Sequence, residues 1–421
     1  MVTAETLPSG LRLATESMPH VRSVTVGVWL TRGSRHESDA EAGVAHFTEH
    51  MLFKGTSSRS AQQIAQTIDS IGGQLDAFTA KEHASYYIKV LDEHLPIAMD
   101  LLSDMVLRPA FSPVDVVKEQ TVILEEIKMV EDTPDDLVHE MFSQRFWAAH
   151  PLGRPILGTP ASVGSFTSAQ LREYFQRTYV APNVIIAAAG RLDHANFRAL
   201  VEGAFASLPG RTPMQVTEPP AITSGLIERH KDIEQTHICI GTPAYPQAHV
   251  DRHAVYVLNT ILGGSMSSRL FQHIREERGL VYAVFSNLVT YSDAGTITVY
   301  AGCAHDKVAE VIDLTLAELR GLRETLVPAE ELRRAKDHLK GSLMLSLEST
   351  SSRMAHLARQ ELYFGRHLSL DDTLVSIDAV TAEDVQRIAV DLFRDSALVA
   401  TMVGPKSSAP FPIERLSITR R

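Results

Sequence analysis

The sequence repeats one pattern of segments at a fixed interval. Thr167 begins a stretch of helical period that leads to an apolar run ending at Gly190, and Thr381 begins a similar stretch that leads to Gly404. Both pairs are 214 residues apart, since 381 − 167 and 404 − 190 give the same value. Repetition at this distance indicates a duplicated domain, and 421 residues exceed what one hydrophobic core usually supports. We therefore predict an α+β protein of two homologous α/β-sandwich domains related by internal duplication.

A proline-rich stretch divides the two copies. Residues 208–224 hold four prolines and one glycine between periodic segments, as a connector between domains would. Before this stretch, residues 24–31 alternate in apolar character, whereas residues 95–106 and 114–130 follow a helical period. We expect an N-terminal domain over residues 1–212 and a C-terminal domain over residues 220–421.

Composition and charge exclude several classes of protein. The formal net charge is −11 and no block of lysine and arginine compensates for it, which argues against a nucleic-acid partner. No apolar run approaches the roughly 18 residues that cross a bilayer, and residues 1–10 do not have the pattern of a secretory signal. The two cysteines, Cys239 and Cys303, are too few for a disulfide framework. We expect no membrane partner and a bacterial cytoplasmic location, although a mature organellar protein fits the same features.

Two histidines and a glutamate occur at the spacing of a metal-binding helix. Residues 46–50 read His-Phe-Thr-Glu-His, within the longer segment of residues 43–56. At about 100° per residue on a helix, His46, Glu49 and His50 share one side. Two imidazoles one turn apart suit a tetrahedral Zn²⁺, and a carboxylate beside them can take a proton from water. The same spacing also occurs on exposed amphipathic helices, so a third ligand is needed to decide.

Residues 118–132 offer that third ligand. Around Glu126, the residues within about 60° on a helical wheel are Glu119, Val122, Ile123, Met129 and Val130. Glu125 falls outside this apolar stripe. Buried carboxylates are costly unless a cation or strong donors compensate, and a zinc ion bound by Glu126 would do so, with Glu119 orienting a ligand. The alternative is that the stripe runs along the surface and that both acids are solvated.

Taken together, these residues resemble the pitrilysin family of inverzincin zinc peptidases, whose His-x-x-Glu-His order is the reverse of the common zincin motif. The likeness runs over residues 7–404. It is carried by residues 46–56, 121–128 and 150–158, which read HFTEHMLFKGT, TVILEEIK and HPLGRPILG. Within the family, the chain is most similar to the β-subunits of mitochondrial processing peptidases and their bacterial homologues.

The resemblance implies a role for each residue of the motif. One Zn²⁺ per chain would be bound by His46, His50 and Glu126. Glu49 would be the general base and Glu119 a supporting acid. Residues 254–264, the counterpart of the metal-binding segment in the second copy, carry no ligand-type side chains. The second domain is therefore expected to lack a metal.

A second pair of residues follows from the resemblance alone. Arg275 and Tyr282 match an arginine and a tyrosine that the family carries seven residues apart. Their implied roles are to anchor the substrate backbone and to donate a hydrogen bond to the tetrahedral oxyanion. From the residues alone, Arg275 is an ordinary helix residue and Tyr282 an ordinary core aromatic.

A substrate-binding strand is implied in the same way. Asp76-Ala77-Phe78-Thr79 resembles the exposed edge strand to which the family binds substrate by β-augmentation. Most relatives have asparagine at the first of these positions, so Asp76 adds negative charge near the peptide path.

The expected function is that of a zinc metalloendopeptidase acting on peptides and on extended or unfolded polypeptides. The family encloses its site in a chamber of four homologous domains, so two copies of this chain, a homodimer, are implied. One alternative is the catalytic subunit of a presequence-processing peptidase, in a heterodimer with a separate regulatory partner. Another is a structural subunit like the core proteins of respiratory complex III. The complete set of zinc residues favours a catalytic chain, and so does Gly263-Gly264, which stands where the regulatory subunits carry a long glycine-rich loop.

Overall fold

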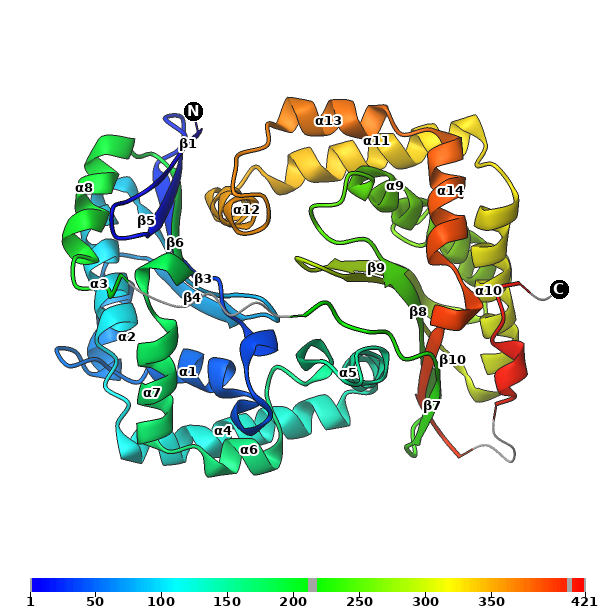
Figure 1. The fold of residues 1–421 in the computed structure, drawn as a ribbon, viewed down its shortest axis with the longest axis horizontal. Helices are drawn as coiled ribbons and strands as arrows, with labels where there is room; N and C mark the ends of the chain where they lie inside the picture. Colours follow the sequence, from blue (N-terminus) through cyan, green and yellow to red (C-terminus); the bar gives the residue numbers. More distant parts are fainter. Residues whose placement is uncertain (1, 211–217, 407–410, 420–421) are drawn as a thin grey trace. The chain divides into compact units, whose positions relative to one another are not determined.

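The structure is a computed structural model that describes residues 2–210, 218–406 and 411–419 (Figure 1). The chain divides into two compact units. Unit 1 comprises residues 1–128, 154–217 and 345–368, and unit 2 comprises residues 129–153, 218–344 and 369–421. Part of the predicted connector, residues 211–217, lies outside the described residues.

Unit 1 is built on a six-stranded mixed sheet. Its strand order is β1 (Val2–Thr6), β2 (Arg12–Ser17), β6 (Val184–Gly190), β3 (Ser23–Leu30), β5 (Ala84–Leu91) and β4 (Gln74–Thr79). Strands β2 and β6 run parallel, whereas the other neighbouring pairs are antiparallel. Strands β3 and β6 are buried along almost their whole length because helices cover both faces of the sheet. Strand β4 forms one edge.

Unit 2 repeats five of these six strands. Its order is β7 (Gly225–His230), β11 (Val399–Gly404), β8 (Gln235–Ala244), β10 (Gly295–Ala304) and β9 (Val281–Thr290). Strands β7 and β11 run parallel, as β2 and β6 do in unit 1, and the remaining pairs are antiparallel. Apart from β1, the order and the strand directions equal those of unit 1. The predicted α+β fold of two homologous domains is therefore confirmed.

The helices pack on both faces of the two sheets. In chain order they are α1 (Val44–Leu52), α2 (Ala61–Ser70), α3 (Leu95–Leu107), α4 (Pro113–Asp132), α5 (Pro134–Phe146), α6 (Pro160–Ser165), α7 (Ser168–Thr178), α8 (His194–Ala204), α9 (Arg252–Leu262), α10 (Val308–Glu324), α11 (Ala329–Ser346), α12 (Thr350–Tyr363), α13 (Leu370–Asp378) and α14 (Ala382–Leu392). None of the described helices combines the length and the apolar character that a bilayer span requires.

The repeated sequence segments begin equivalent helices with equivalent caps. The Thr167 hydroxyl accepts the N–H of Gln170 at the start of α7, and the Thr381 hydroxyl accepts the N–H of Asp384 at the start of α14. In both cases the side chain three residues on reaches back to the N–H of the capping threonine, which completes a capping box. Each helix leads to a buried inner strand, β6 or β11. The constant interval in the sequence thus reflects one helix–strand element used twice.

Each unit takes one helix from the other half of the sequence. Helix α5 packs on β11, β8 and β7 of unit 2, and α12 packs on the equivalent strands β6, β3 and β2 of unit 1. Figure 1 shows the orange α12 beside strands coloured blue to green, and the teal α5 beside green and red ones. In unit 1, Met354 and Leu357 of α12 pack against Trp29 and Ala187.

Because of this exchange, the two units do not coincide with the predicted domain ranges. A division into residues 1–212 and 220–421 assigns residues 129–153 to the first unit and residues 345–368 to the second, whereas their contacts place them the other way round. The physical reason is that sequence periodicity shows that a helix has an apolar face but not which sheet that face covers.

Candidate metal centre

Helix α1 carries the two histidines of the motif. Gly43 precedes the helix with a φ of 92°, in the left-handed region that favours glycine. The buried Glu37 carboxylate accepts the N–H groups of Gly43 and Ala45, each at 2.8 Å. These donors would otherwise be unsatisfied at the helix N-terminus. Glu37, which is not among the predicted site residues, therefore fixes the start of the helix beside His46.

Helix α4 carries the two carboxylates, two turns apart on one side. Glu119 is buried, whereas the Glu126 side chain is 35% exposed. The predicted apolar stripe is wrong in part, since Ile123 lies in the core but Val122 and Met129 are 42% and 67% exposed. The helix buries a narrower face than the wheel predicts. Glu126 therefore lies where the buried face meets solvent, and neither acid follows the fully solvated alternative.

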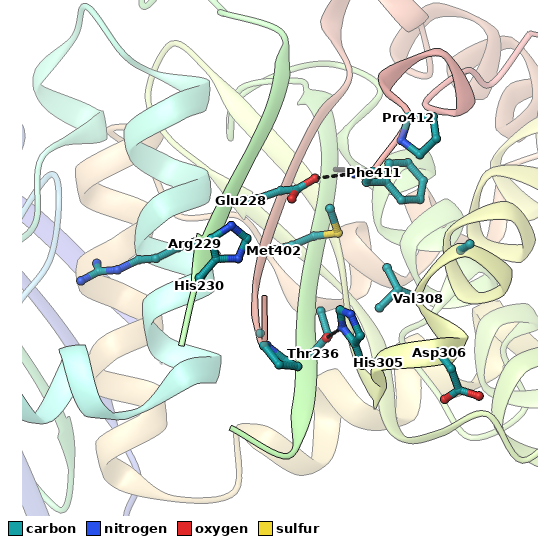
Figure 2. A pocket seen from close by; sticks show the side chains of 13 residues that line it. Glu228, Arg229, His230, Thr236, His305, Asp306, Val308, Met402, Phe411 and Pro412 are labelled. Atoms are coloured by element: carbon teal, nitrogen blue, oxygen red, sulfur yellow. Dashed lines mark hydrogen bonds between the residues drawn. The ribbon is translucent and has the colours of Figure 1, made fainter. Parts of the chain in front are cut away.

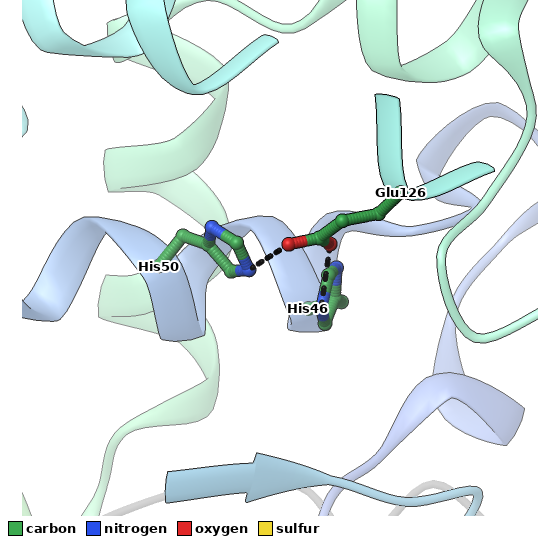
Figure 3. A group of neighbouring side chains, drawn as sticks. All are labelled: His46, His50 and Glu126. Atoms are coloured by element: carbon green, nitrogen blue, oxygen red, sulfur yellow. Dashed lines mark ion pairs between the residues drawn. The ribbon is translucent and has the colours of Figure 1, made fainter. Parts of the chain in front are cut away.

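The side chains of His46, His50 and Glu126 converge (Figure 3). His46 Nε2 lies 3.7 Å from one carboxylate oxygen of Glu126, and His50 Nε2 lies 3.6 Å from the other. The three potential ligand atoms lie within 4.8 Å of one another, and the described residues contain no second such group. A tetrahedral Zn²⁺ with bonds of about 2.0–2.1 Å separates its ligands by roughly 3.3 Å. Small side-chain shifts would therefore bring these atoms to coordination distance.

The charges at this site favour a bound cation. Burial lowers the pKa of His46 to about 4, so that its imidazole is neutral near pH 7. His50 directs Nδ1 to the Glu119 carboxylate 3.0 Å away and Nε2 to the Glu126 carboxylate 3.6 Å away. The Nε2 atoms of His46 and His50 both lie beyond hydrogen-bond distance from Glu126, and a cation between the three groups would bind all of them. Two imidazoles and one carboxylate are a ligand set of catalytic zinc sites, so the residues fit the metal.

Glu119 links His50 to a lysine. One Glu119 oxygen lies 3.0 Å from His50 Nδ1, and the other lies 2.8 Å from Lys54 Nζ. The Glu119 carboxylate orients the His50 ring, as carboxylates behind metal-binding histidines do. Lys54 is not among the predicted site residues. No local sequence pattern marks it, because its partner Glu119 lies 65 residues further along the chain (119 − 54).

We expect Lys54→Met to weaken zinc binding without removing a ligand. The loss of the ammonium group leaves Glu119 less firmly held, and changes behind metal ligands typically cost about 10–100-fold in affinity. Zinc retention against a graded series of chelator concentrations measures this, with thermal unfolding as a check on the fold. Lys54→Arg should restore most of the affinity because it keeps the charge. Wild-type zinc affinity in Lys54→Met would show that the ion pair does not support the site.

Glu49 lies on α1 and faces the edge strand β4. Its carboxylate accepts a hydrogen bond from the Thr79 hydroxyl. Burial is the largest of the causes that raise the pKa of Glu49 above its ordinary value. A carboxylate with a raised pKa accepts a proton more readily at neutral pH, which is what a general base requires.

All four residues predicted for the edge strand lie in β4. Ala77 and Thr79 point toward the side of the sheet that packs on α1, and Asp76 and Phe78 point the other way. The Asp76 carboxylate accepts the hydroxyl of Tyr87 at 3.0 Å. In register, β4 pairs with β5 alone among the described strands, so its outer backbone groups are available for another strand.

Arg275 and Tyr282 lie together in unit 2. Arg275 belongs to a short π-helix, Phe271–Glu276, and its guanidinium carbon lies 5.6 Å from the centre of the Tyr282 ring. Tyr282, near the start of β9, is 81% exposed. It is therefore not the core aromatic that its sequence context alone would suggest. The pair belongs to a different unit from the three potential metal ligands.

Comparison with known proteins identifies the family. Residues 12–160 match the family described as Insulinase (Peptidase family M16), and residues 165–339 match the domain described as Peptidase M16 inactive domain. The chain belongs to peptidase family M16, the pitrilysin family. The first M16 match contains His46, His50 and Glu126. The second covers much of unit 2, where the described residues contain no comparable ligand group.

Similar M16 proteins extend over nearly the whole chain. A protein of Bacillus subtilis named as an uncharacterized zinc protease is 41% identical over 410 residues, which cover 97% of this chain and 100% of that protein. Another protein with this name, from Mycobacterium tuberculosis, is 44% identical over 416 residues, which cover 96% and 94%. A crystal structure of a peptidase M16 inactive domain from Pseudomonas fluorescens gives a TM-score of 0.91 at 22% identity, over 98% of this chain and 100% of that one. The last comparison shows the fold.

Unit 2 contains a cavity of about 290 Å³, apart from the candidate metal centre (Figure 2). It lies beside β7 and the start of α10. Glu228 accepts the N–H of Phe411 at 2.9 Å on one side of it, and Thr236 hydrogen-bonds His305 at 3.1 Å on another. None of the predicted site residues is among the described residues that line this cavity, so it forms no part of the candidate metal centre.

Proposed function

We propose that the protein is a zinc-dependent endopeptidase that hydrolyses peptides and extended or unfolded polypeptides. One Zn²⁺ per chain would be held by His46, His50 and Glu126. The observation that carries this proposal is the convergence of these three side chains beside Glu49, a partly buried carboxylate with a raised pKa. Membership of family M16 and the names of the zinc protease relatives support the same activity.

The side chains around the metal have separate tasks in this reaction. When bound, Zn²⁺ would polarise the scissile carbonyl and lower the pKa of the attacking water. Glu49 takes a proton from that water and later gives it to the amine leaving group. Thr79 orients the Glu49 carboxylate through its hydroxyl. Glu119, held by Lys54, keeps the His50 ring turned toward Glu126.

Strand β4 supports the choice of substrate. An extended peptide can add to its outer edge as a further strand, with backbone hydrogen bonds that are independent of sequence. Thr79 joins this strand to Glu49, so a peptide bond paired near the end of β4 would lie close to the base. A segment already folded into helix or sheet cannot make these bonds, which favours extended or unfolded substrates.

The direct test combines metal analysis with product identification. The purified protein should bind Zn²⁺ and hydrolyse internal bonds of unstructured peptides, and mass spectrometry of the products identifies the bonds. Removal of the metal with a chelator should stop hydrolysis, and added Zn²⁺ should restore it. A zinc-loaded, folded protein that cleaves no member of a diverse peptide library would refute the proposal.

We further propose that the active assembly is a homodimer in which each site combines Glu49 of one chain with Tyr282 of the other. The chain supplies two homologous domains, and Tyr282 lies in a different unit from the metal centre. Its exposed hydroxyl is available to a substrate. A site shared between chains would use both kinds of domain.

Subunit exchange tests this arrangement. Glu49→Gln and Tyr282→Phe homodimers should each be weakly active or inactive. Mixed dimers would contain one doubly damaged site and one intact site, so activity should reappear after exchange. Tagged subunits confirm that exchange has taken place. An unchanged rate in confirmed mixed dimers would show that Glu49 and Tyr282 act within one chain, because every site then keeps one defect.

A further inference from the structure

A groove lies beside β4, at the opposite end of the strand from Thr79. It has a volume of about 680 Å³ and runs between α2, the end of α1 and residues 73–76. Apolar side chains form its floor and two carboxylates lie among its lining residues: Phe53, Ile64, Ile68 and Leu75, with Asp69 and Asp76. We call this feature the β4 groove. All of the residues named belong to unit 1, as do the three potential metal ligands.

The β4 groove is continuous with the edge that would bind the substrate. Thr79, at one end of β4, donates to Glu49, and Leu75, toward the other end, lines the groove. The two residues are four positions apart on the strand, which corresponds to about 13 Å. A peptide paired along β4 with its scissile bond near Thr79 would therefore place a side chain at the groove about four positions from that bond.

The lining of the groove specifies the chemistry of its occupant. Ile64 and Ile68 are buried, and Phe53 and Leu75 pack on the same core, so the floor can take an apolar side chain. No lysine, arginine or histidine is among the described residues that line the groove. Lys89 pairs in register with Gln74, at the end of β4, and is not one of the lining residues. The carboxylates of Asp69 and Asp76 therefore favour a cationic neighbour beside the apolar side chain.

We propose that the β4 groove is a binding subsite for the peptide substrate. It takes an apolar side chain about four positions from the scissile bond, and its two carboxylates attract a lysine or arginine next to that side chain. This proposal rests on the proposed peptidase function. It predicts a preference for substrates that are long enough to reach the groove and that combine apolar and basic residues there.

Filling the groove tests the proposal. Ala65 lies on α2 and lines the groove, so Ala65→Trp should block it. The neighbouring residue Gln66 is exposed and does not line the groove, so Gln66→Trp is the matched control. Two fluorogenic peptides share one cleavage sequence. The short one ends two residues from the scissile bond on each side, and the long one extends past the groove in both directions, with leucine beside lysine at the expected position.

The ratio of kcat/KM for the long peptide over the short one is the decisive quantity. It should fall about tenfold or more in Ala65→Trp, as expected for the loss of one buried apolar side chain, and should stay at the wild-type value in Gln66→Trp. Asp69→Asn with Asp76→Asn should reduce the preference for lysine over glutamate beside the leucine. An unchanged ratio in folded Ala65→Trp would overturn the subsite.

Direct binding separates this proposal from the peptidase function. Fluorescence anisotropy of the long peptide gives its affinity for wild type, Ala65→Trp and Gln66→Trp, whether or not the peptide is cleaved. Weaker binding to Ala65→Trp alone supports the subsite. Equal binding to all three proteins overturns it. Absence of cleavage with groove-dependent binding would refute the peptidase function and leave the subsite standing.

Discussion

Glu49→Gln is expected to abolish peptide hydrolysis while the zinc content stays at the wild-type level. Glutamine keeps the size of the side chain but cannot take a proton from water, and loss of a general base typically costs on the order of 10²–10⁴-fold in rate. Glu49 is not one of the three residues whose ligand atoms converge, so the metal should stay. Both quantities are measured on one preparation, kcat/KM with a fluorogenic peptide and zinc by elemental analysis.

For Glu49→Gln, the rate tests whether Glu49 is the base, and the zinc content tests whether it binds the metal. Full activity would contradict the role of Glu49 as the base. Loss of zinc would instead show that Glu49 takes part in metal binding. Thr79→Val is a useful companion, because it removes the hydroxyl that orients the carboxylate and leaves the carboxylate in place. Its rate should lie between those of wild type and Glu49→Gln.

Glu126→Gln should lose zinc together with activity, whereas Glu125→Gln should keep both. The Glu126 carboxylate lies between the two histidines, and an uncharged amide is a much weaker ligand for Zn²⁺. The loss of affinity should exceed the roughly 10–100-fold that is typical of residues behind the ligands. Glu125 is chemically identical and adjacent, but it is exposed and pairs with Lys128 at 2.7 Å.

Competition with a chromophoric chelator gives the zinc affinity of both variants. Circular dichroism and thermal unfolding show whether each variant is folded, which matters because Glu126 lies on a long helix that carries core residues. The reverse outcome, loss of zinc from Glu125→Gln and not from Glu126→Gln, would require a different third ligand. Wild-type zinc affinity in both variants would show that Glu126 is not a ligand.

Local structure follows the sequence most closely where apolar periods are long. The helical period over residues 95–106 predicts α3, and that over residues 114–130 predicts α4 within two residues at either end. The 214-residue interval predicts the equivalence of α7 with α14 and of β6 with β11. These features depend on contacts within one segment or on a repeated pattern, both of which are visible along the chain.

Other features depend on which segments meet in space. Lys54 follows the end of α1 and forms an ion pair with the buried Glu119 of α4. No local sequence pattern shows that contact. The exposure of Tyr282 follows from its place on the outer strand β9. Val122 and Met129 are exposed because the core reaches only part of the predicted apolar face of α4. Periodicity locates a face, and only the packing decides how much of it is covered.

The exchange of α5 and α12 has a consequence for the order in which the chain can fold during synthesis. The last strand of unit 1 ends at Gly190 and its covering helix begins at Thr350, 160 residues later (350 − 190). At about 5–20 residues per second, the ribosome needs roughly 8–32 s for this interval. During that time the sheet face around Trp29 and Ala187 has no partner.

For helix α5 the order of synthesis is reversed, because the helix comes first and the sheet follows. It is made before any strand of the sheet that it covers, and its apolar residues Val138 and Phe142 meet Val399 and Val403 only when β11 has been synthesised. The nascent chain thus carries two apolar surfaces, each of which is buried by residues near the other end of the sequence. Neither half can finish folding before the ribosome has produced almost the whole polypeptide. Chaperone binding to the growing chain should therefore persist until α12 and β11 emerge.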